Sequence, residues 1–135
     1  MEIIDDINKT ISWLESNIRN TNLPVVSENV NRLAIQCYHF SDVVANAYDV
    51  ANTAECEYKY IKAMFIKNFQ GSVTGAQNTA DADEKVREAK VLLTEAENTY
   101  NRLKLYLGEF RNILDCFRQR VSVERQVSTN LGYQT

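Results

Sequence analysis

Apolar residues recur at alternating steps of three and four along most of this chain, the spacing of one face of an α-helix. Near the N-terminus the pattern predicts an amphipathic helix over residues 2–20. This helix ends before Pro24, because proline disfavours the helical conformation in the residue before it. Its apolar face holds Ile4, Ile7, Ile11, Leu14 and Ile18.

A second, longer pattern predicts a helix over residues 27–68, with Ser27 as its N-cap. No glycine or proline interrupts it, and five heptads in phase indicate a helix of the coiled-coil type. The apolar stripe consists of Val30, Leu33, Cys37, Phe40, Val44, Ala47, Ala51, Ala54, Tyr58, Ile61 and Phe65.

A third pattern predicts a helix over residues 79–126. Its stripe consists of Ala82, Val86, Ala89, Leu93, Ala96, Tyr100, Leu103, Leu107, Phe110, Leu114, Phe117 and Val121. A second apolar line repeats every seven residues on its flank, at Leu92, Thr99, Tyr106 and Ile113. One seam suffices for a pair of helices, so the second line indicates that another helix or another subunit packs there.

The polar, glycine-bearing run 70–78 predicts a turn, and a short turn makes the two long helices antiparallel neighbours. This register sets Phe65 near Ala82, Ala51 near Ala96 and Val44 near Leu103. The predicted fold is therefore all-α: a long antiparallel helical hairpin plus a shorter N-terminal helix. We expect one helical domain over 1–126 and a polar, flexible tail over 127–135.

A thin hairpin leaves part of its apolar surface uncovered, and large exposed apolar patches usually mark partners. We therefore expect a homo-oligomer. The residues predicted to form the oligomer or partner surface are Tyr48, Leu92, Tyr106 and Ile113.

Composition narrows the class of protein. The chain has 135 residues, of which 44% are hydrophobic and 24% charged, with 4 glycines and 1 proline. These values fit one small helical protein and exclude a turn-rich β-sandwich. The longest apolar runs are too short for a membrane span, and the acidic N-terminus is unlike a secretory signal. The three cysteines are an odd number and lie far apart in the sequence, which fits a reducing compartment. We therefore expect a cytoplasmic protein, in the cytoplasm of the host cell if a phage encodes it.

Catalytic chemistry is not indicated. His39 is the single histidine, no Cys–His–acid cluster surrounds it, and no ExxH pair is present. We therefore expect a non-enzymatic protein with no catalytic residues, no bound metal and no cofactor.

Charge is unevenly distributed around a net value of −3. Residues 76–100 hold six acidic and three basic side chains, whereas residues 101–135 hold three acidic and six basic. A smaller basic group, Lys59, Lys62 and Lys67, alternates with aromatic residues, of which Tyr60 and Phe69 lie off the core stripe. Lysines bind phosphate and aromatic faces stack unpaired bases, but lysines on the outer face of a long helix are also simply solvated.

From about residue 55 onward the chain resembles the phage recombination mediators of the UvsY type. The likeness lies in AKVLLTEAENTYNRLKLYLGEF, in the run from Ile113 to Arg120 that ends in a basic pair, and in the basic, aromatic stretch 59–65 ahead of a glycine-containing loop. The resemblance implies a homo-oligomeric accessory protein that binds single-stranded DNA and helps a recombinase load on strands held by a strand-coating protein. By this likeness Lys59 and Lys62 are the implied DNA-contacting pair, with Lys67 adjacent. The complete set of residues that we expect to bind nucleic acid is Lys59, Lys62, Lys67, Tyr60, Arg118 and Arg120.

Two functions thus follow from the sequence. The first is a single-stranded-DNA-binding recombination mediator. The alternative is a helical protein–protein interaction module without a nucleic-acid role, such as an adaptor, a virion component or an inhibitor of a host system. In that alternative, the acidic stretch 81–97 occupies a basic groove on a partner.

Overall fold

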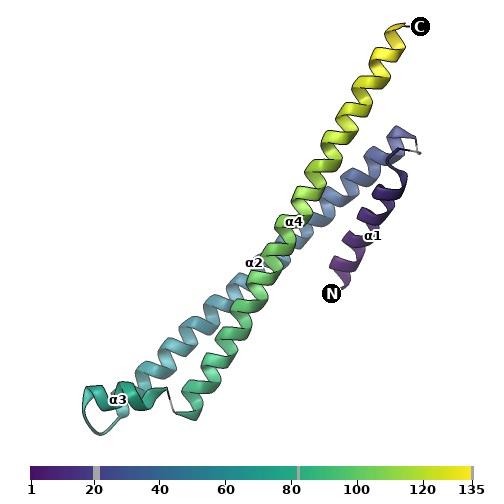
Figure 1. Ribbon diagram of the computed structural model, residues 1–135. Helices are drawn as coiled ribbons and strands as arrows, with labels where there is room; N and C mark the ends of the chain where they lie inside the picture. Colours follow the sequence, from purple (N-terminus) through teal and green to yellow (C-terminus); the bar gives the residue numbers. More distant parts are fainter. Residues whose placement is uncertain (20–21, 82, 135) are drawn as a thin grey trace. The chain divides into compact units, whose positions relative to one another are not determined.

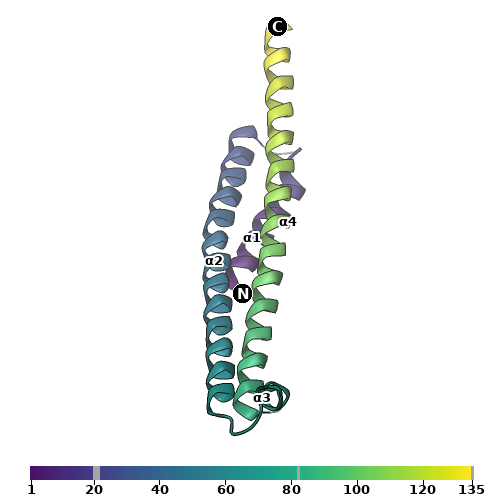
Figure 2. The ribbon, with the colours of Figure 1, turned by 90° about the vertical axis from the view of Figure 1, so that its left-hand side faces the viewer.

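A computed structural model describes residues 1–19, 22–81 and 83–134. Within these ranges the chain forms four helices and no strand: α1 (Glu2–Asn17), α2 (Leu23–Asn68), α3 (Val73–Ala80) and α4 (Glu84–Gln134). The long helices α2 and α4 pack against each other and lie side by side in both views (Figures 1 and 2). The predicted all-α helical hairpin, preceded by a shorter helix, is confirmed.

The helix ends differ from the predicted ones. Helix α1 ends at Asn17 rather than 20, and α2 begins at Leu23 rather than 27. The early start places Pro24 in the first turn of α2, where its missing N–H costs nothing because first-turn N–H groups have no partner within the helix. Helix α4 continues to Gln134, so most of the predicted tail 127–135 is helical.

The predicted turn at 70–78 was wrong in part, because most of it forms the short helix α3. Ser72 caps this helix: its Oγ accepts a hydrogen bond from the Gly75 N–H at 3.0 Å. A second cap begins α4, where the Asp83 carboxylate accepts from the Val86 N–H at 3.2 Å. The predicted third helix is thus divided into α3 and α4. Ala82, predicted to begin its stripe opposite Phe65, lies outside the described residues.

The chain divides into two compact units. The first, called the α1 unit, comprises Met1–Val43 and Leu105–Thr135, and the second, called the α3 unit, comprises Val44–Lys104. Helices α2 and α4 each contribute a stretch to both.

The α1 unit has a closed core built by three helical segments. Helix α1 turns back beside the start of α2 (Figure 1) and buries Ile7, Ile11 and Leu14 of the face predicted for it, whereas Ile4 is half-buried. Phe40 is fully buried, and its ring meets that of Phe110 edge-on at 5.7 Å between centroids. The remaining buried apolar residues of this unit are Ile7, Ile11, Leu14, Ile18, Val26, Val30, Leu33, Cys37, Leu107, Leu114, Phe117 and Val121.

The α3 unit has a thinner seam. Tyr48 of α2 lies 5.2 Å from Tyr100 of α4 between ring centroids, in agreement with the antiparallel register predicted from the heptads. Six apolar side chains of α2 and α4 are buried in it: Val44, Ala51, Val86, Ala89, Leu93 and Leu103. The predicted stripe residues Ala47, Ala54, Tyr58, Ile61 and Phe65 are only half-buried.

Candidate nucleic-acid interface

The three predicted DNA-binding lysines lie on two faces of α2. Lys59 and Lys62 are three residues apart and share one face, whereas Lys67 lies seven residues beyond Tyr60 and shares the face of that ring. Tyr60 is 65% exposed. The face with Tyr60 and Lys67 therefore presents an accessible aromatic ring and an exposed cation together.

Lys59 and Lys62 already have carboxylate partners. The Lys59 Nζ lies 2.9 Å from Glu55 Oε1 one turn back, and the Lys62 Nζ lies 3.2 Å from Asp81 Oδ1 at the end of α3. Hydrogen bonding to Glu55 raises the pKa of Lys59, and hydrogen bonding to Asp81 raises the pKa of Lys62. Both lysines remain charged at neutral pH, but part of their charge is neutralised within the protein.

Tyr58 lies beneath two lysines. The Lys62 Nζ is 5.8 Å and the Lys90 Nζ 5.1 Å from the centre of its ring, distances that allow cation–π attraction. The half-buried ring thus already has two ammonium groups of the protein beside it. The heptad pattern placed this ring on the buried stripe of the helix, and the structure leaves it half-buried.

A surface cavity of about 670 Å³ lies beside Tyr60. Phe65 and Phe69 line it with Tyr60, and the rings of the two phenylalanines are 5.9 Å apart between centroids. The cavity also receives the side chains of Met64, Ile61, Asn68, Gln70, Asp83, Glu84 and Lys85. It therefore combines aromatic faces with amide groups and one lysine, next to two carboxylates.

Sequence reasoning missed part of this cavity. It kept Tyr60 and Phe69 as available aromatic residues but assigned Phe65 to the core, where the structure leaves it half-buried. Phe65 lies in the last turn of α2 and Phe69 directly follows its end at Asn68, and a spacing of four residues brings the two rings together there. Lys85 could not be found in this way, because only folding brings the start of α4 to this cavity.

Arg118 and Arg120 belong to the α1 unit, so the structure does not join them to the lysine group. Arg118 lies 3.8 Å from the Asp115 carboxylate, and Arg120 is half-buried. Nearby, Arg125 donates a hydrogen bond from its guanidinium to Ser27 Oγ at 2.9 Å. Of the predicted arginine pair, Arg118 is therefore exposed beside a carboxylate of its own helix, and Arg120 is only partly exposed.

The predicted oligomer surface also divides between the units. In the α3 unit Tyr48 is 49% and Leu92 60% exposed, and in the α1 unit Tyr106 is 38% exposed. Ile113 is half-buried. Three of the four side chains thus remain accessible, as an oligomer surface requires.

Other chemistry finds little support in the described residues. They contain no group of three or more His, Cys, Asp or Glu side chains placed to hold a metal ion. His39 lies against Tyr38, 6.0 Å away between ring centroids. Cys37 is buried, whereas Cys56 and Cys116 are exposed. Burial raises the pKa of the Cys37 thiol, although Arg111 and Arg118 partly oppose the shift.

Comparison of the chain with known proteins found no match. No family model, curated protein sequence or solved structure matches the chain. Across the described part of the chain, no helix has the length and apolar character that crossing a membrane requires.

Proposed function

We propose that this protein is a non-enzymatic, self-associating recombination mediator that binds single-stranded DNA. The aromatic cavity beside Tyr60 is the observation that carries the proposal. The wider role, in which the protein helps a recombinase load on strands held by a strand-coating protein in the host cytoplasm, rests on the resemblance to UvsY-type mediators.

The cavity suits an unpaired base. Stacking of a base on an aromatic side chain contributes about 1–3 kcal/mol and tolerates any sequence, because every base has a π-face. Tyr60 supplies an exposed ring, while Asn68 and Gln70 supply amide donors and acceptors for base edges. Aromatic faces and amides together are typical of sites for unpaired nucleotides.

Lysines around the cavity supply the attraction for phosphate. Lys67 shares the face of Tyr60, and Lys85 lines the cavity itself. Lys59 is 70% exposed in its pair with Glu55, and exposed pairs of this kind contribute little stability. A DNA phosphate can therefore replace Glu55 as the partner of Lys59.

Self-association completes the proposal. One chain offers only a few cations for phosphate and a net charge of −3, so a single site binds weakly. Several copies on one strand act together, and linking weak sites raises the overall affinity by about 10²–10⁴ without any new contact.

The test is fluorescence anisotropy with a labelled oligo-dT strand. We expect Tyr60→Ala to weaken binding about tenfold, the loss of one stacked base. Tyr38→Ala is the matched control, because Tyr38 is a 69% exposed tyrosine of the same helix in the other unit.

Replacing Lys59 and Lys67 with Ala tests the phosphate contacts. It should reduce the slope of log affinity against log salt concentration by about 0.7 for each phosphate that these lysines bind. An absence of binding at about 50 mM salt, or equal losses for Tyr60→Ala and Tyr38→Ala, would refute the proposal.

The alternative, a helical protein–protein interaction module, draws on a different observation. The α3 unit carries an uncovered apolar groove with an acidic rim, in line with the acidic stretch 81–97. Adaptors, virion components and inhibitors of host systems all use surfaces of this kind. If oligo-dT does not bind while the groove takes a helix, the alternative is favoured.

A further inference from the structure

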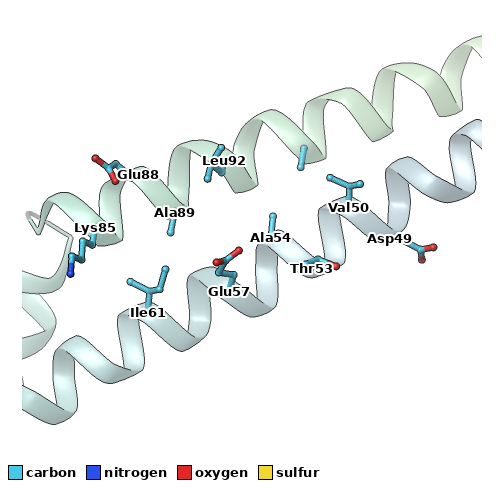
Figure 3. A pocket seen from close by; sticks show the side chains of 11 residues that line it. Asp49, Val50, Thr53, Ala54, Glu57, Ile61, Lys85, Glu88, Ala89 and Leu92 are labelled. Carbon is cyan, nitrogen blue, oxygen red and sulfur yellow. The ribbon is translucent and has the colours of Figure 1, made fainter.

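An apolar groove of about 560 Å³ lies between α2 and α4 in the α3 unit (Figure 3). Small side chains leave this space open: Ala54 and Ala89 point into it from opposite helices. The apolar lining consists of Val50, Ala54, Ile61, Ala89, Leu92 and Ala96. We call it the alanine groove.

Two of the three larger apolar side chains of the alanine groove are exposed to solvent, and the third, Ile61, is half-buried. Val50 and Leu92 are each 60% exposed, one on either helix. A second hollow adjoins the first, since Leu92 and Glu88 line both, and it adds Val91, which is 55% exposed. Single exposed apolar residues are ordinary, but residues gathered around one groove mark a docking surface.

The rim of the groove is acidic. Five carboxylates border the two hollows, against two cations, Lys85 and Arg87. The five are Asp49, Glu57, Glu84, Glu88 and Glu95. The rim therefore attracts a basic occupant and repels an acidic one.

We propose that the alanine groove docks a basic amphipathic helix of another protein. The groove runs along α2 from Val50 to Ile61, about 16 Å at 1.5 Å per residue, which matches three turns of helix. An amphipathic helix places apolar anchors at steps of three and four on one face, and lysine or arginine on its flanks meets the rim. A second copy docked face to face would set these carboxylates against their own equivalents, which disfavours that occupant. The proposal goes beyond DNA binding and does not depend on it.

Two synthetic helices serve as probes. Both carry Leu at the a and d positions of three heptads, and the remaining positions are Lys in one and Glu in the other. We expect the fluorescein-labelled Lys helix to bind the full chain, and the Glu helix to bind at least about tenfold more weakly. Leu92→Gln should weaken binding of the Lys helix about tenfold, the effect of burying one leucine less.

Matched variants separate docking from general attraction. Leu105→Gln is the apolar control, because Leu105 is a 69% exposed leucine of the same helix in the α1 unit. The charge test compares two double variants. One carries Glu57→Gln and Glu88→Gln at the rim of the groove, and the other carries Glu109→Gln and Glu124→Gln in the α1 unit. Ala54→Leu fills the groove and should also abolish binding without removing any charge.

Three results would overturn the proposal. Equal losses for Leu92→Gln and Leu105→Gln would show non-specific adhesion, and equal losses for the two glutamine pairs would show attraction by net charge alone. Dissociation of an oligomer by Leu92→Gln in light scattering, with no change in binding of the Lys helix, would assign the groove to contacts between copies. Unchanged helicity and melting midpoint of each variant exclude misfolding, and oligo-dT binding of the same variants tests the DNA proposal separately.

Discussion

The two units of this protein share one heptad pattern but bury it to different extents. In the α1 unit Leu33 and Phe40 on the stripe of α2 are fully buried, whereas in the α3 unit Ala54 and Ile61 on the same stripe are half-buried. Two differences account for this. The third helix of the α1 unit, α1, has 16 residues and buries Ile7, Ile11 and Leu14, whereas α3 has 8 residues and, among its described side chains, buries only Ala76 and Ala80. The stripe of the α1 unit also carries larger side chains. A heptad repeat thus specifies which face two helices share, but closing that face requires volume and a further layer.

The comparison also separates stability from binding in physical terms. Closed, well-packed cores hold a structure together, whereas partly covered apolar surface is available to a partner. Both the aromatic cavity and the alanine groove lie in the α3 unit. The residues proposed for function therefore lie where the seam is incomplete.

The largest effect that tests this comparison is the loss of a phenylalanine ring from each unit. Phe40→Ala removes a fully buried ring that meets Phe110, so we expect it to lower the free energy of unfolding by about 3–5 kcal/mol. Phe65→Ala removes a half-buried ring and should cost about 1–2 kcal/mol. Urea denaturation of both variants measures the difference, and equal costs would show that the two seams are packed alike.

Much of this fold could be predicted from the sequence, because a regular helix places apolar residues of one face at regular intervals. The stripe from Val30 to Val44 and the stripe from Leu103 to Val121 were predicted as core, and all of these positions are buried. The same rule overestimated burial at Tyr58 and Phe65, because periodicity identifies a face but not what covers it.

The ends of the helices and the candidate site were less accessible to sequence reasoning. Helix α3 begins at the Ser72 cap, a local hydrogen bond. The two glycines of the run 70–78 favoured a turn, so the helix was not predicted. The carboxylate partners of the two lysines differ in how far they can be predicted. Glu55 precedes Lys59 by one helical turn, so this pair can be read from the sequence, whereas Asp81 lies near Lys62 only because the chain folds back. Lys85 in the aromatic cavity depends on the fold in the same way.

The second largest expected effect is on the reaction rate of buried thiols, one placed in each unit. In a Cys56→Ser, Cys116→Ser background, Cys37 of the α1 unit should react with a maleimide about 100-fold more slowly than an exposed thiol, the protection given by a local opening free energy of about 3 kcal/mol. Ala51→Cys, placed on the seam of the α3 unit in a chain that also carries Cys37→Ser, should react faster than Cys37 does. The exposed Cys116 of the native chain sets the unprotected rate. Equal protection of the two buried thiols would contradict the comparison.

The pKa of Cys37 adds a pH dependence of known sign. Burial favours the neutral thiol, so the folded-state pKa lies above the ordinary value of 9.0. The folded state then holds its proton where the unfolded state has released it, and the stabilising contribution is lost as pH rises above about 9. Cys37→Ala should flatten the alkaline decline of the unfolding midpoint. Cys116→Ala, a change at an exposed thiol, should leave that decline unaltered.

The smallest effect compares one substitution at a helical glycine in each unit. Gly108 lies within α4, and a Cβ built there meets no other atom within 4 Å, so it does not serve a close approach of helices. Gly108→Ala should therefore raise the free energy of unfolding by up to about 1 kcal/mol, the helix propensity difference between the two residues.

The glycine to compare with it in the α3 unit is Gly75 of α3. A Cβ built there lies 3.0 Å from Ser72 Oγ, the oxygen that caps this helix. Gly75→Ala gains the same propensity but displaces a cap worth about 1 kcal/mol, so we expect little net change. Thermal unfolding followed by circular dichroism measures both midpoints. Equal gains would show that the Ser72 cap contributes nothing to the α3 unit, and a loss at Gly108 would contradict the open surface found there.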